Sequence, residues 1–303
     1  MLIDDVVHFC DEMFVSYNGK CGCEIGHCNY PSGLCSGSCY NCLYHIHYPD
    51  RAPENSKKEY DCVKMLYHYV CQYSYLYTTE LLCAFEFEWD FIKDFLQYHI
   101  LSLGCGGCAD LMAFENLLQI KGRLNPISYI GIDINPLWTP IHSRIQTYCD
   151  AENIGYKTYY SDVFDFFKQH SVPDTNIVVI SYLISYLYNT KQIGAINTLA
   201  ELLAKQVVMH KGMPLLLIIN DVNSYKRGRN YFYLFEQAIQ RSGLSINKSL
   251  YKYFDTGSLY DGQKLGTPYD IVSVPFSIPR EIQLRYHANK SINSTVQFLV
   301  EVS

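Results

Sequence analysis

The residues best suited to chemistry stand in a short glycine-rich stretch and in a carboxylate that follows it. The apolar run 100–103 ends in Gly104-Cys105-Gly106-Gly107, and a second apolar run, 129–132, stops on Asp133. Small residues at the start of a helix let backbone N–H groups approach a ligand closely. A carboxylate at the carboxyl end of the next strand is placed to accept hydrogen bonds from a ribose diol. The pattern predicts a site for a nucleotide-type ligand.

A second candidate site is a cysteine-rich segment, residues 21–49. It holds six cysteines and three histidines among Gly, Ser, Pro and Asn, a composition that forms loops around a metal rather than a hydrophobic core. Tetrahedral zinc takes four Cys or His ligands, so the segment has enough ligands for one site with spares or for two sites. The candidate ligands are Cys21, Cys23, Cys28, Cys35, Cys39 and Cys42, with His27, His45 and His47 close by.

Zinc is the metal expected in this segment, with two alternatives left open. A four-cysteine iron–sulfur cluster suits the same residues, and so do unliganded buried thiols. The spacing Cys35-x3-Cys39-x2-Cys42 also resembles the cluster motif of radical S-adenosylmethionine enzymes. Those enzymes are built on a partial or complete barrel, whereas the remainder of this chain predicts an open sheet, which argues against that class.

Composition narrows the class of protein. A chain of 303 residues accommodates one large domain, or one domain with a small appendage. The formal charge of −6 argues against a general nucleic-acid coat. The N-terminal text carries acids where a secretory signal needs basic residues, and no apolar run is long enough to cross a bilayer. With thirteen cysteines, an odd number, the chain cannot pair them all internally. We expect a cytoplasmic protein with no membrane partner.

Periodicity predicts an α/β architecture, a doubly wound and mainly parallel sheet. Helical spacing covers 1–20, and again 60–97, where two or three helices are expected to cover one edge of the sheet. Three divisions follow: a metal-binding module at 1–59, a helical connection at 60–97 and a ligand-binding domain at 98–303. Strands are expected near 99–103, 128–133, 156–160, 176–181 and 215–221, helices at 109–121, 140–153, 163–170, 191–211 and 230–242, and further β structure at 250–254, 271–274 and 295–302.

The order of these features resembles the class I S-adenosylmethionine-dependent methyltransferases over about 98–303. The resemblance implies that Gly104 and Gly106 surround the methionine part of the cofactor and that Asp133 holds the ribose hydroxyls. It also implies that Asp162 reads the adenine amino group, with Val163 or Phe164 beside the ring. The implied cofactor-binding set is Ser102, Gly104, Cys105, Gly106, Asp133, Ile134, Asp162, Val163 and Ser181.

Two departures and one alternative accompany the resemblance. Ser102 stands where the family often has an acid, and Cys108 stands where it often has a third glycine. A nicotinamide-binding Rossmann domain also fits Gly104, Gly106 and Ala109 through its looser G-x-G-x-x-A fingerprint. Asp162, which follows the third strand, favours the methyltransferase, although by itself it could be a helix N-cap.

Catalytic residues are hard to name for this chemistry. A sulfonium is already an activated leaving group, so positioning supplies much of the rate, and a base is needed only for a protonated acceptor. The candidates at the ends of the fourth and fifth strands are Ser181, Tyr182, Asn220 and Asp221. The chain lacks, at the fourth strand, the Asn/Asp-Pro-Pro-aromatic tetrad and the Pro-Cys nucleophile of DNA methyltransferases, which disfavours both classes.

Basic residues after the fifth strand bear on the acceptor. Lys226, Arg227 and Arg229 alternate with Tyr225 and Tyr231, which suits a phosphate backbone with stacked bases. The alternative is a solvated loop that leads into a helix. The sequence therefore predicts a methyltransferase with a metal module and an RNA or protein acceptor. The competing function is a non-catalytic S-adenosylmethionine-binding sensor or scaffold.

Overall fold

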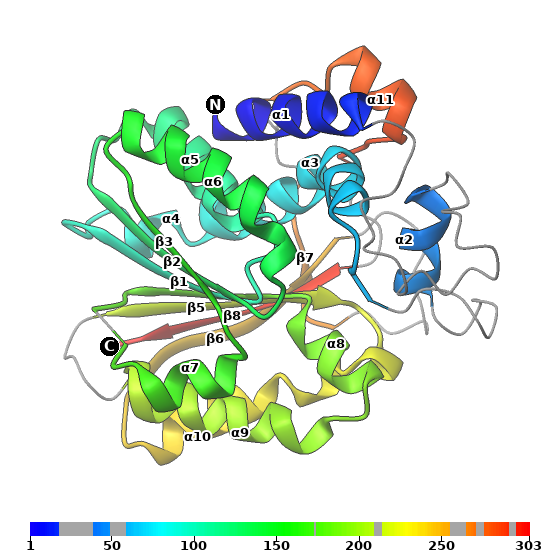
Figure 1. Cartoon of the computed structure of the whole chain (residues 1–303). Coiled ribbons are helices and arrows are strands. Elements are labelled where there is room, and N and C mark those ends of the chain that lie inside the picture. The colour runs from blue at the N-terminus through cyan, green and yellow to red at the C-terminus, as the bar shows by residue number, and fades with distance from the viewer. Residues whose placement is uncertain are drawn as a thin grey trace.

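The computed structural model describes residues 1–17, 39–48, 59–172, 174–208, 214–254, 265–270, 276–290 and 295–303. Its centre is an eight-stranded sheet in the order β3-β2-β1-β4-β5-β8-β6-β7 (Figure 1). The strands are β1 (Tyr98–Leu103), β2 (Ile127–Asp133), β3 (Gly155–Tyr160), β4 (Ile177–Ser181), β5 (Leu215–Val222), β6 (Ile246–Tyr253), β7 (Thr267–Pro268) and β8 (Thr295–Val302).

The central strands are buried on both faces, which explains their composition. Residues 177–180 of β4 and 215–221 of β5 are all buried, and both strands read as nearly continuous Val, Ile and Leu. Strands covered on both faces take such runs instead of the alternation of half-exposed strands. The pattern that predicted these strands therefore also predicted their place in the middle of the sheet.

The direction of β8 distinguishes this sheet from a fully parallel one. β1 to β5 pair in parallel, whereas β8 lies antiparallel between β5 and β6. A dinucleotide-binding Rossmann sheet has the order 3-2-1-4-5-6 with no reversed strand inserted. The sheet is that of the class I methyltransferase type, so the expected fold class is confirmed.

Helices cover both faces of the sheet. One face carries α1 (Leu2–Ser16), α3 (Val63–Phe87), α5 (Ala109–Lys121) and α6 (Thr139–Ala151), which share one core cluster. The other carries α7 (Val163–Gln169), α9 (Ile193–Leu203) and α10 (Tyr233–Arg241) in a second cluster. Figure 1 shows the two layers above and below the sheet. The shorter helices are α2 (Cys39–His47), α4 (Trp89–Ile92), α8 (Leu183–Asn189) and α11 (Arg280–Tyr286), and a π-helical turn, Ala204–Val208, continues α9.

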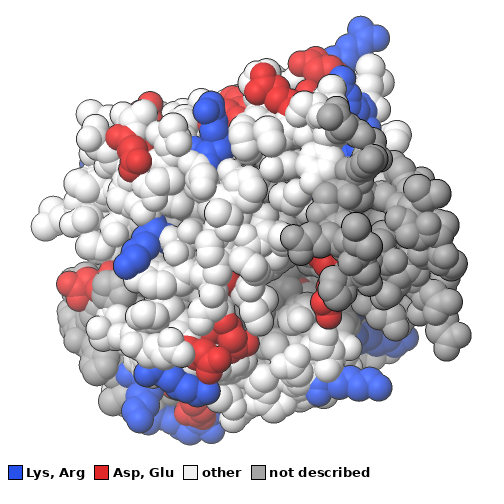
Figure 2. Space-filling view, viewed as in Figure 1, with Lys and Arg blue, Asp and Glu red and all other residues white. Residues whose placement is uncertain are grey.

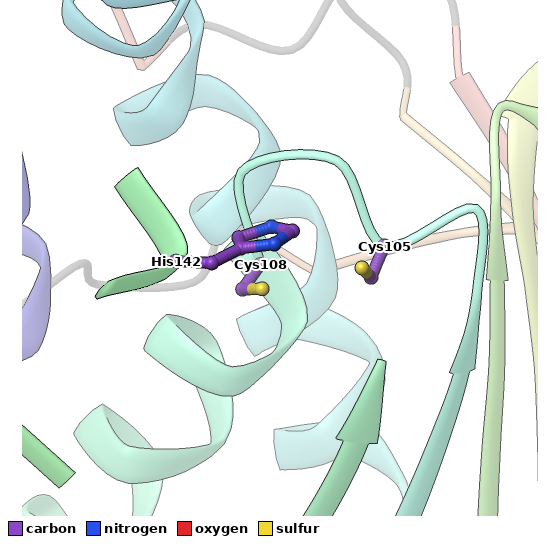
Figure 3. A group of neighbouring side chains, drawn as sticks. All are labelled: Cys105, Cys108 and His142. Atoms are coloured by element: carbon purple, nitrogen blue, oxygen red, sulfur yellow. The ribbon is translucent and has the colours of Figure 1, made fainter. Parts of the chain in front are cut away.

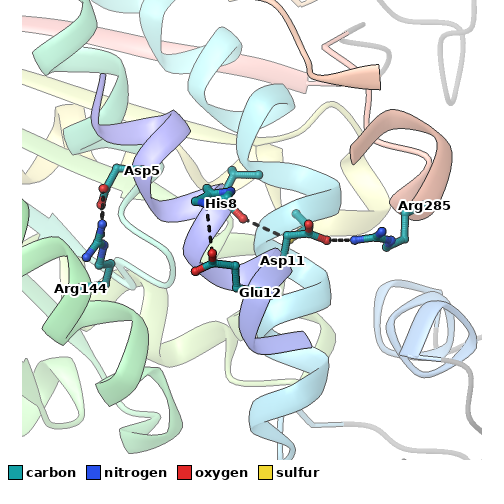
Figure 4. A network of polar contacts seen from close by, with 8 residues as sticks. Asp5, His8, Asp11, Glu12, Arg144 and Arg285 are labelled. Atoms are coloured by element: carbon teal, nitrogen blue, oxygen red, sulfur yellow. Dashed lines mark hydrogen bonds and ion pairs between the residues drawn. The ribbon is translucent and has the colours of Figure 1, made fainter. Parts of the chain in front are cut away.

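Helix α1 is joined to the rest of the molecule at both ends. Near its start, Arg144 of α6 donates from Nε to Asp5 Oδ2 at 2.8 Å. Near its end, Asp11 pairs with Arg285 of α11 and accepts from the Tyr286 hydroxyl at 2.7 Å. Figure 4 shows both ion pairs on the same helix. These contacts connect the first helix to α6 and to the last helix of the chain, so α1 is part of the packed fold.

Most predicted elements are found within a few residues of their expected limits. Residues 60–97 contain one long helix, α3, and the short α4. Sequence patterns missed α8 and α11, and they predicted loops over 21–49, where residues 39–47 form α2. The strand expected at 271–274 lies outside the described residues. No helix in the described ranges is long and apolar enough to cross a membrane.

Candidate functional site

The turn between β1 and α5 uses left-handed backbone positions. Gly104 and Gly106 have φ angles of +73° and +46°, a region that glycine adopts without steric cost. The amides of Gly104 and Cys105 donate to the carbonyl of Ile132 at 2.8 and 3.0 Å, which joins the turn to the end of β2. A Cβ at Gly104 would lie 3.6 Å from Leu183, and one at Gly106 would lie 3.6 Å from Trp138. A side chain at either position would occupy space beside the turn. Its absence leaves that space to a ligand that approaches the backbone closely.

Asp133 is attached to this turn through its side chain. Its Oδ2 accepts from the Gly106 amide at 2.9 Å, and its Oδ1 accepts from the Asn135 amide at 2.9 Å. Burial raises the pKa of Asp133, and the two backbone amides oppose that shift. Each carboxylate oxygen has two lone pairs, so one site on each remains for a diol. The expected meeting of the glycine turn and Asp133 is present.

Ser102 faces a buried carboxyl group. It is 2% exposed, and its hydroxyl acts to lower the pKa of Asp110, which accepts a hydrogen bond from the Tyr129 hydroxyl at 2.9 Å. Burial raises the pKa of Asp110 to about 7. The acid that the family often carries on this strand is absent at Ser102, and Asp110 at the start of α5 places a carboxyl group directly against it.

Asp162 caps a helix. Its Oδ1 accepts from the Phe164 amide at 2.8 Å at the start of α7, the N-cap geometry that stabilises a helix start. Val163 is buried in the core cluster on this face of the sheet, and Ile134 is 64% exposed. The cap is the alternative role weighed for Asp162, and its proposed contact with adenine stays a prediction.

The ends of β4 and β5 meet a carboxylate that comes from α3. Asn220 donates from Nδ2 to Glu80 Oε2 at 3.0 Å and to Ser181 Oγ at 3.3 Å. The Tyr182 hydroxyl donates to Glu80 Oε2 at 2.8 Å, and the Thr295 hydroxyl donates to Oε1 at 2.6 Å. Three of the four predicted catalytic candidates, Ser181, Tyr182 and Asn220, therefore lie around one buried acid.

The environment of Glu80 moves its titration to neutral pH. Its side chain is buried, with 1% of the residue exposed. This burial raises the pKa of Glu80 to about 7, although the hydrogen bonds from Asn220, Thr295 and Tyr182 act in the opposite direction. A carboxyl group with a pKa near the working pH is suited to exchange protons. The group has the properties of an acid–base residue.

Glu80 was missed because its partners are remote in the sequence. It belongs to α3, which contacts both β5 and β8, and its hydrogen-bond partners follow it by 102 to 215 residues. One signal was available: an acid stands directly before the apolar text Leu81-Leu82-Cys83 on a helix. Charged residues are seldom buried without a partner, so an acid on an apolar face marks a polar site.

The Asp221 side chain accepts hydrogen bonds from backbone amides. Its Oδ2 accepts from the Ser185 amide at 2.8 Å, and its Oδ1 accepts from the amide of Val222 at 2.7 Å. Burial raises the pKa of Asp221 to about 6. The carboxylate thus binds the first turn of α8 and fixes that helix beside the end of β5.

A row of tyrosines connects the glycine turn with Glu80. Tyr69, Tyr73 and Tyr77 follow one another at helical spacing on α3, with ring centroids 5.2 and 5.6 Å apart. Tyr69 lies 5.6 Å from Trp138 at one end, and Tyr77 lies 4.7 Å from Tyr182 at the other. The row forms an aromatic wall between the glycine turn and the buried Glu80 carboxylate.

The predicted metal segment is described only in part. Cys39 and Cys42 of α2 are buried and pack with Cys62 and Met65. His47 Nε2 lies 2.9 Å from the Tyr60 hydroxyl, and burial lowers the pKa of His47 to about 4. Cys21, Cys23, His27, Cys28 and Cys35 lie outside the described residues. Within the described ranges, the group with metal-ligand spacing is instead Cys105, Cys108 and His142.

The basic loop after β5, residues 225–231, was predicted to contact a phosphate backbone, and one of its three basic residues does not face solvent. Arg229 is 3% exposed and donates from Nη1 to Asn223 Oδ1, so it faces the protein interior. Arg227 donates to Asn189 Oδ1 at 3.2 Å, and Lys226 lies over the Tyr225 ring at 5.5 Å. Lys and Arg side chains gather along the lower border of the face in Figure 2, and its centre is mostly uncharged.

No protein-family model and no curated protein matches the sequence. The solved structures that resemble the chain include S-adenosylmethionine-dependent methyltransferases. The plantazolicin methyltransferase BpumL, in complex with a monoazolic desmethylPZN analog and SAH, is 13% identical, covers 86% of this chain and 93% of its own, and has a TM-score of 0.45. An S-adenosylmethionine-dependent methyltransferase from Clostridium acetobutylicum is 10% identical over 87% of this chain and 99% of its own, with a TM-score of 0.41. An enzyme of this kind from Aquifex aeolicus is 9% identical over 71% and 89%, with a TM-score of 0.35. The strand order, rather than these scores, defines the fold.

Proposed function

We propose that this chain is an S-adenosylmethionine-dependent methyltransferase in which Tyr182 and Glu80 remove a proton from the acceptor. The observation that carries the proposal is the buried Glu80 carboxylate, bonded to the Tyr182 hydroxyl and to Asn220 at the carboxyl ends of β4 and β5. Those strand ends are where open α/β sheets bind ligands. Leu183, the residue after Tyr182, lies against the glycine turn, so the cofactor side and the acid belong to one site.

The chain offers a cradle that suits this cofactor. The glycine turn, which lacks side chains at Gly104 and Gly106, and the carboxylate of Asp133 would surround its methionine and ribose parts, with Asp162 and Val163 beside the adenine. When bound, the cofactor supplies an activated methyl group and a neutral thioether leaving group. In this proposal residues 98–303 form the cofactor-binding domain, 60–97 connect and contribute Glu80, and 1–59 carry the zinc-binding residues after helix α1, which packs in the main core.

Proton removal proceeds through a relay. The acceptor proton moves to the phenol oxygen of Tyr182 as the tyrosine proton moves to Glu80 Oε2, which lies 2.8 Å from that oxygen. Because the pKa of Glu80 is about 7, a large share of the carboxyl groups is ionised at neutral pH and accepts the proton. Asn220 and Thr295 hold the carboxylate in place. The relay leaves the acceptor with a lone pair for the methyl carbon.

For the acceptor we propose a macromolecule, RNA or protein. The aromatic wall of Tyr69, Tyr73 and Tyr77 provides planar surfaces for stacking. Lys226 and Arg227 are the cations of the basic loop that are compatible with phosphate, because Arg229 is buried against Asn223. Labelled methyl groups sorted into RNA and protein fractions distinguish the two classes.

The test is methyl labelling in a lysate of a strain that lacks this protein. The wild-type chain with labelled cofactor should label one acceptor, and Glu80→Gln should lower the initial rate roughly 100-fold or more with cofactor affinity unchanged by calorimetry. The matched control is Glu86→Gln on the same helix, where the side chain is 37% exposed and pairs with Lys121. Cofactor binding without any labelled acceptor would support the sensor or scaffold and reject the enzyme.

A further inference from the structure

Two cysteines and a histidine meet beneath the glycine turn. The Sγ atoms of Cys105 and Cys108 and a ring nitrogen of His142 all lie within 4.8 Å of one another. The three residues are buried, with exposed fractions of 7%, 0% and 2%. Figure 3 shows the two thiols on the turn and the imidazole reaching them from α6. The methyl-transfer proposal uses none of these side chains.

The backbone holds the thiols close together at a conformational cost. The Cys108 amide donates to the Cys105 carbonyl at 2.8 Å, the hydrogen bond of a tight turn whose end residues have Cα atoms less than about 7 Å apart. Disulfides need Cα atoms about 4.4–6.8 Å apart. Cys108 also has a φ of +58°, a left-handed conformation that is sterically unfavourable for a non-glycine residue. A glycine would adopt this conformation without strain, so the presence of cysteine at position 108 suggests that its thiol has a role.

Room for the first sulfur comes from the neighbouring strand. A Cβ at Gly131 of β2 would lie 2.8 Å from Cys105 Sγ, closer than such atoms approach without displacement. Gly131 therefore leaves the space that Cys105 occupies. The left-handed backbone at position 108 orients the Cys108 thiol, and the missing side chain at Gly131 leaves room for the Cys105 thiol.

His142 is fixed by contacts on both ring nitrogens. Nε2 lies 2.7 Å from the Gly106 carbonyl, and Nδ1 lies 2.9 Å from the Tyr160 hydroxyl. Because a carbonyl only accepts hydrogen bonds, Nε2 carries the proton. Nδ1 is then left to accept from the Tyr160 hydroxyl, so both ring nitrogens already have protein partners, which favours a thiol pair beside an imidazole over a zinc site. Although burial acts against ionisation, the neighbouring Cys105 thiol and His142 hold the pKa of the Cys108 thiol well below its ordinary value.

We propose that Cys105 and Cys108 are a dithiol that peroxide oxidises to a disulfide, and that this disulfide weakens binding at the glycine turn. Peroxide suits the site because both sulfurs are buried and a molecule close to water in size reaches them more easily than a bulky disulfide does. Oxidation itself is independent of methyl transfer. The effect on affinity rests on the proposed cofactor site.

The reaction balances in two steps. The Cys108 thiolate attacks one peroxide oxygen, the O–O bond breaks, and hydroxide leaves and takes up a proton to become water. Cys105 then attacks the sulfur of the Cys108 sulfenic acid, forming the S–S bond and releasing the second water. Two thiols are oxidised and one peroxide is reduced. A dithiol reductant such as dithiothreitol reverses the change by exchange.

The disulfide would act on the cofactor through the backbone between the two cysteines. Gly106 and Gly107 are the intervening residues, and the Gly106 amide donates to Asp133. Drawing the sulfurs to about 2 Å changes the conformation of these glycines. The turn and the ribose-holding carboxylate should therefore be displaced together.

The test treats the full-length wild-type chain with hydrogen peroxide, alkylates the remaining thiols after denaturation and digests with trypsin. Cleavage after Lys93 and Lys121 leaves Cys105 and Cys108 as the sole cysteines of one peptide, which separates them from the cysteine-rich segment. We expect a peptide that is unalkylated and lighter by two hydrogen atoms, and that dithiothreitol restores. Calorimetry should show affinity for S-adenosylhomocysteine about fivefold lower or more in the oxidised chain.

Three variants make the result decisive. Cys108→Gly suits the left-handed backbone, so it should fold and bind with an affinity that peroxide does not change. Cys105→Ser should show the same affinity before and after peroxide, whatever its affinity relative to wild type, and His142→Gln should slow oxidation. The proposal is overturned if the peptide stays alkylated, if affinity is equal in both redox states, or if Cys108→Gly and His142→Gln each lose one zinc relative to wild type. A reduced wild-type chain with no affinity at all would reject the proposed cofactor instead.

Discussion

The Tyr182 hydroxyl donates to the Glu80 carboxylate at 2.8 Å across a sequence separation of 102 residues. Tyr182 has a φ of +56° as the residue before α8, a strained conformation for a side chain of this size. Such strain persists where the surrounding structure enforces it, often at functional sites. The enforcing contacts here are the Glu80 and Thr295 hydrogen bonds and the aromatic contact with Tyr77. These contacts therefore hold the Tyr182 hydroxyl against Glu80 despite the strained backbone of Tyr182.

The relay predicts a pH dependence of methyl transfer. The base must be ionised, so kcat/KM should rise about tenfold per pH unit below the pKa of Glu80, about 7, and level off above it. Tyr182→Phe removes the connecting hydroxyl and should lower the rate while abolishing this dependence. Steady-state kinetics from pH 5.5 to 8.5 measure it, once an acceptor is identified. A wild-type profile that is flat across pH 7 would contradict the relay.

Buried carboxyl groups predict that the fold loses stability as pH rises. The pKa values of Glu80 and Asp110 are raised to about 7 and that of Asp221 to about 6, against ordinary values of 4.5 and 3.8. The native state therefore retains protons that the unfolded state has released, and the free energy of unfolding falls with rising pH between about 4 and 7. Glu80→Gln should remove the share of this decrease in unfolding free energy that comes from Glu80, up to roughly 3 kcal/mol.

Urea denaturation at pH 5 and pH 8 measures this effect. The exposed Glu86→Gln variant is the matched control and should keep the wild-type difference between the two pH values. An equal fall in wild type and Glu80→Gln would show that Glu80 titrates normally in the folded protein.

Asp133 and Asp162 should respond differently to the same substitution. Asp133→Asn removes the charge from the proposed ribose contacts and should weaken cofactor binding roughly 10-fold or more. Asp162→Asn preserves the N-cap of α7, since Asn caps as well as Asp. A loss of affinity in Asp162→Asn, measured by calorimetry with unchanged melting temperature, would therefore report an adenine contact. Unchanged affinity there would leave Asp162 as a cap alone.

Metal analysis tests the cysteine-rich segment. Anaerobically purified protein should be colourless and hold about one or two zinc ions per chain, which a strong chelator removes. Replacing Cys39 and Cys42 together by serine should lower the zinc content, whereas Cys83→Ser, at a buried cysteine of α3 outside the segment, should not. A brown protein with iron and sulfide would instead establish the cluster alternative.

Local pattern was sufficient for much of the fold. Apolar runs such as 177–180 and 215–219 predicted buried parallel strands, because both faces of such strands are covered. The short helix α8 was missed, since it begins at a left-handed Tyr182 and is capped by Asp221 from another strand. Neither feature leaves a mark in the neighbouring sequence.

What the sequence determined by itself is the glycine turn, Asp133 and their meeting, because the carboxyl ends of adjacent parallel strands necessarily lie at one edge of a sheet. Tertiary structure alone decided which acid lies at the ends of β4 and β5, and that Arg229 faces inward. Those outcomes depend on how α3 packs across β5 and β8 and on the hydrogen bond to Asn223. Contacts between distant segments form only when the whole core does, so no local spacing encodes them.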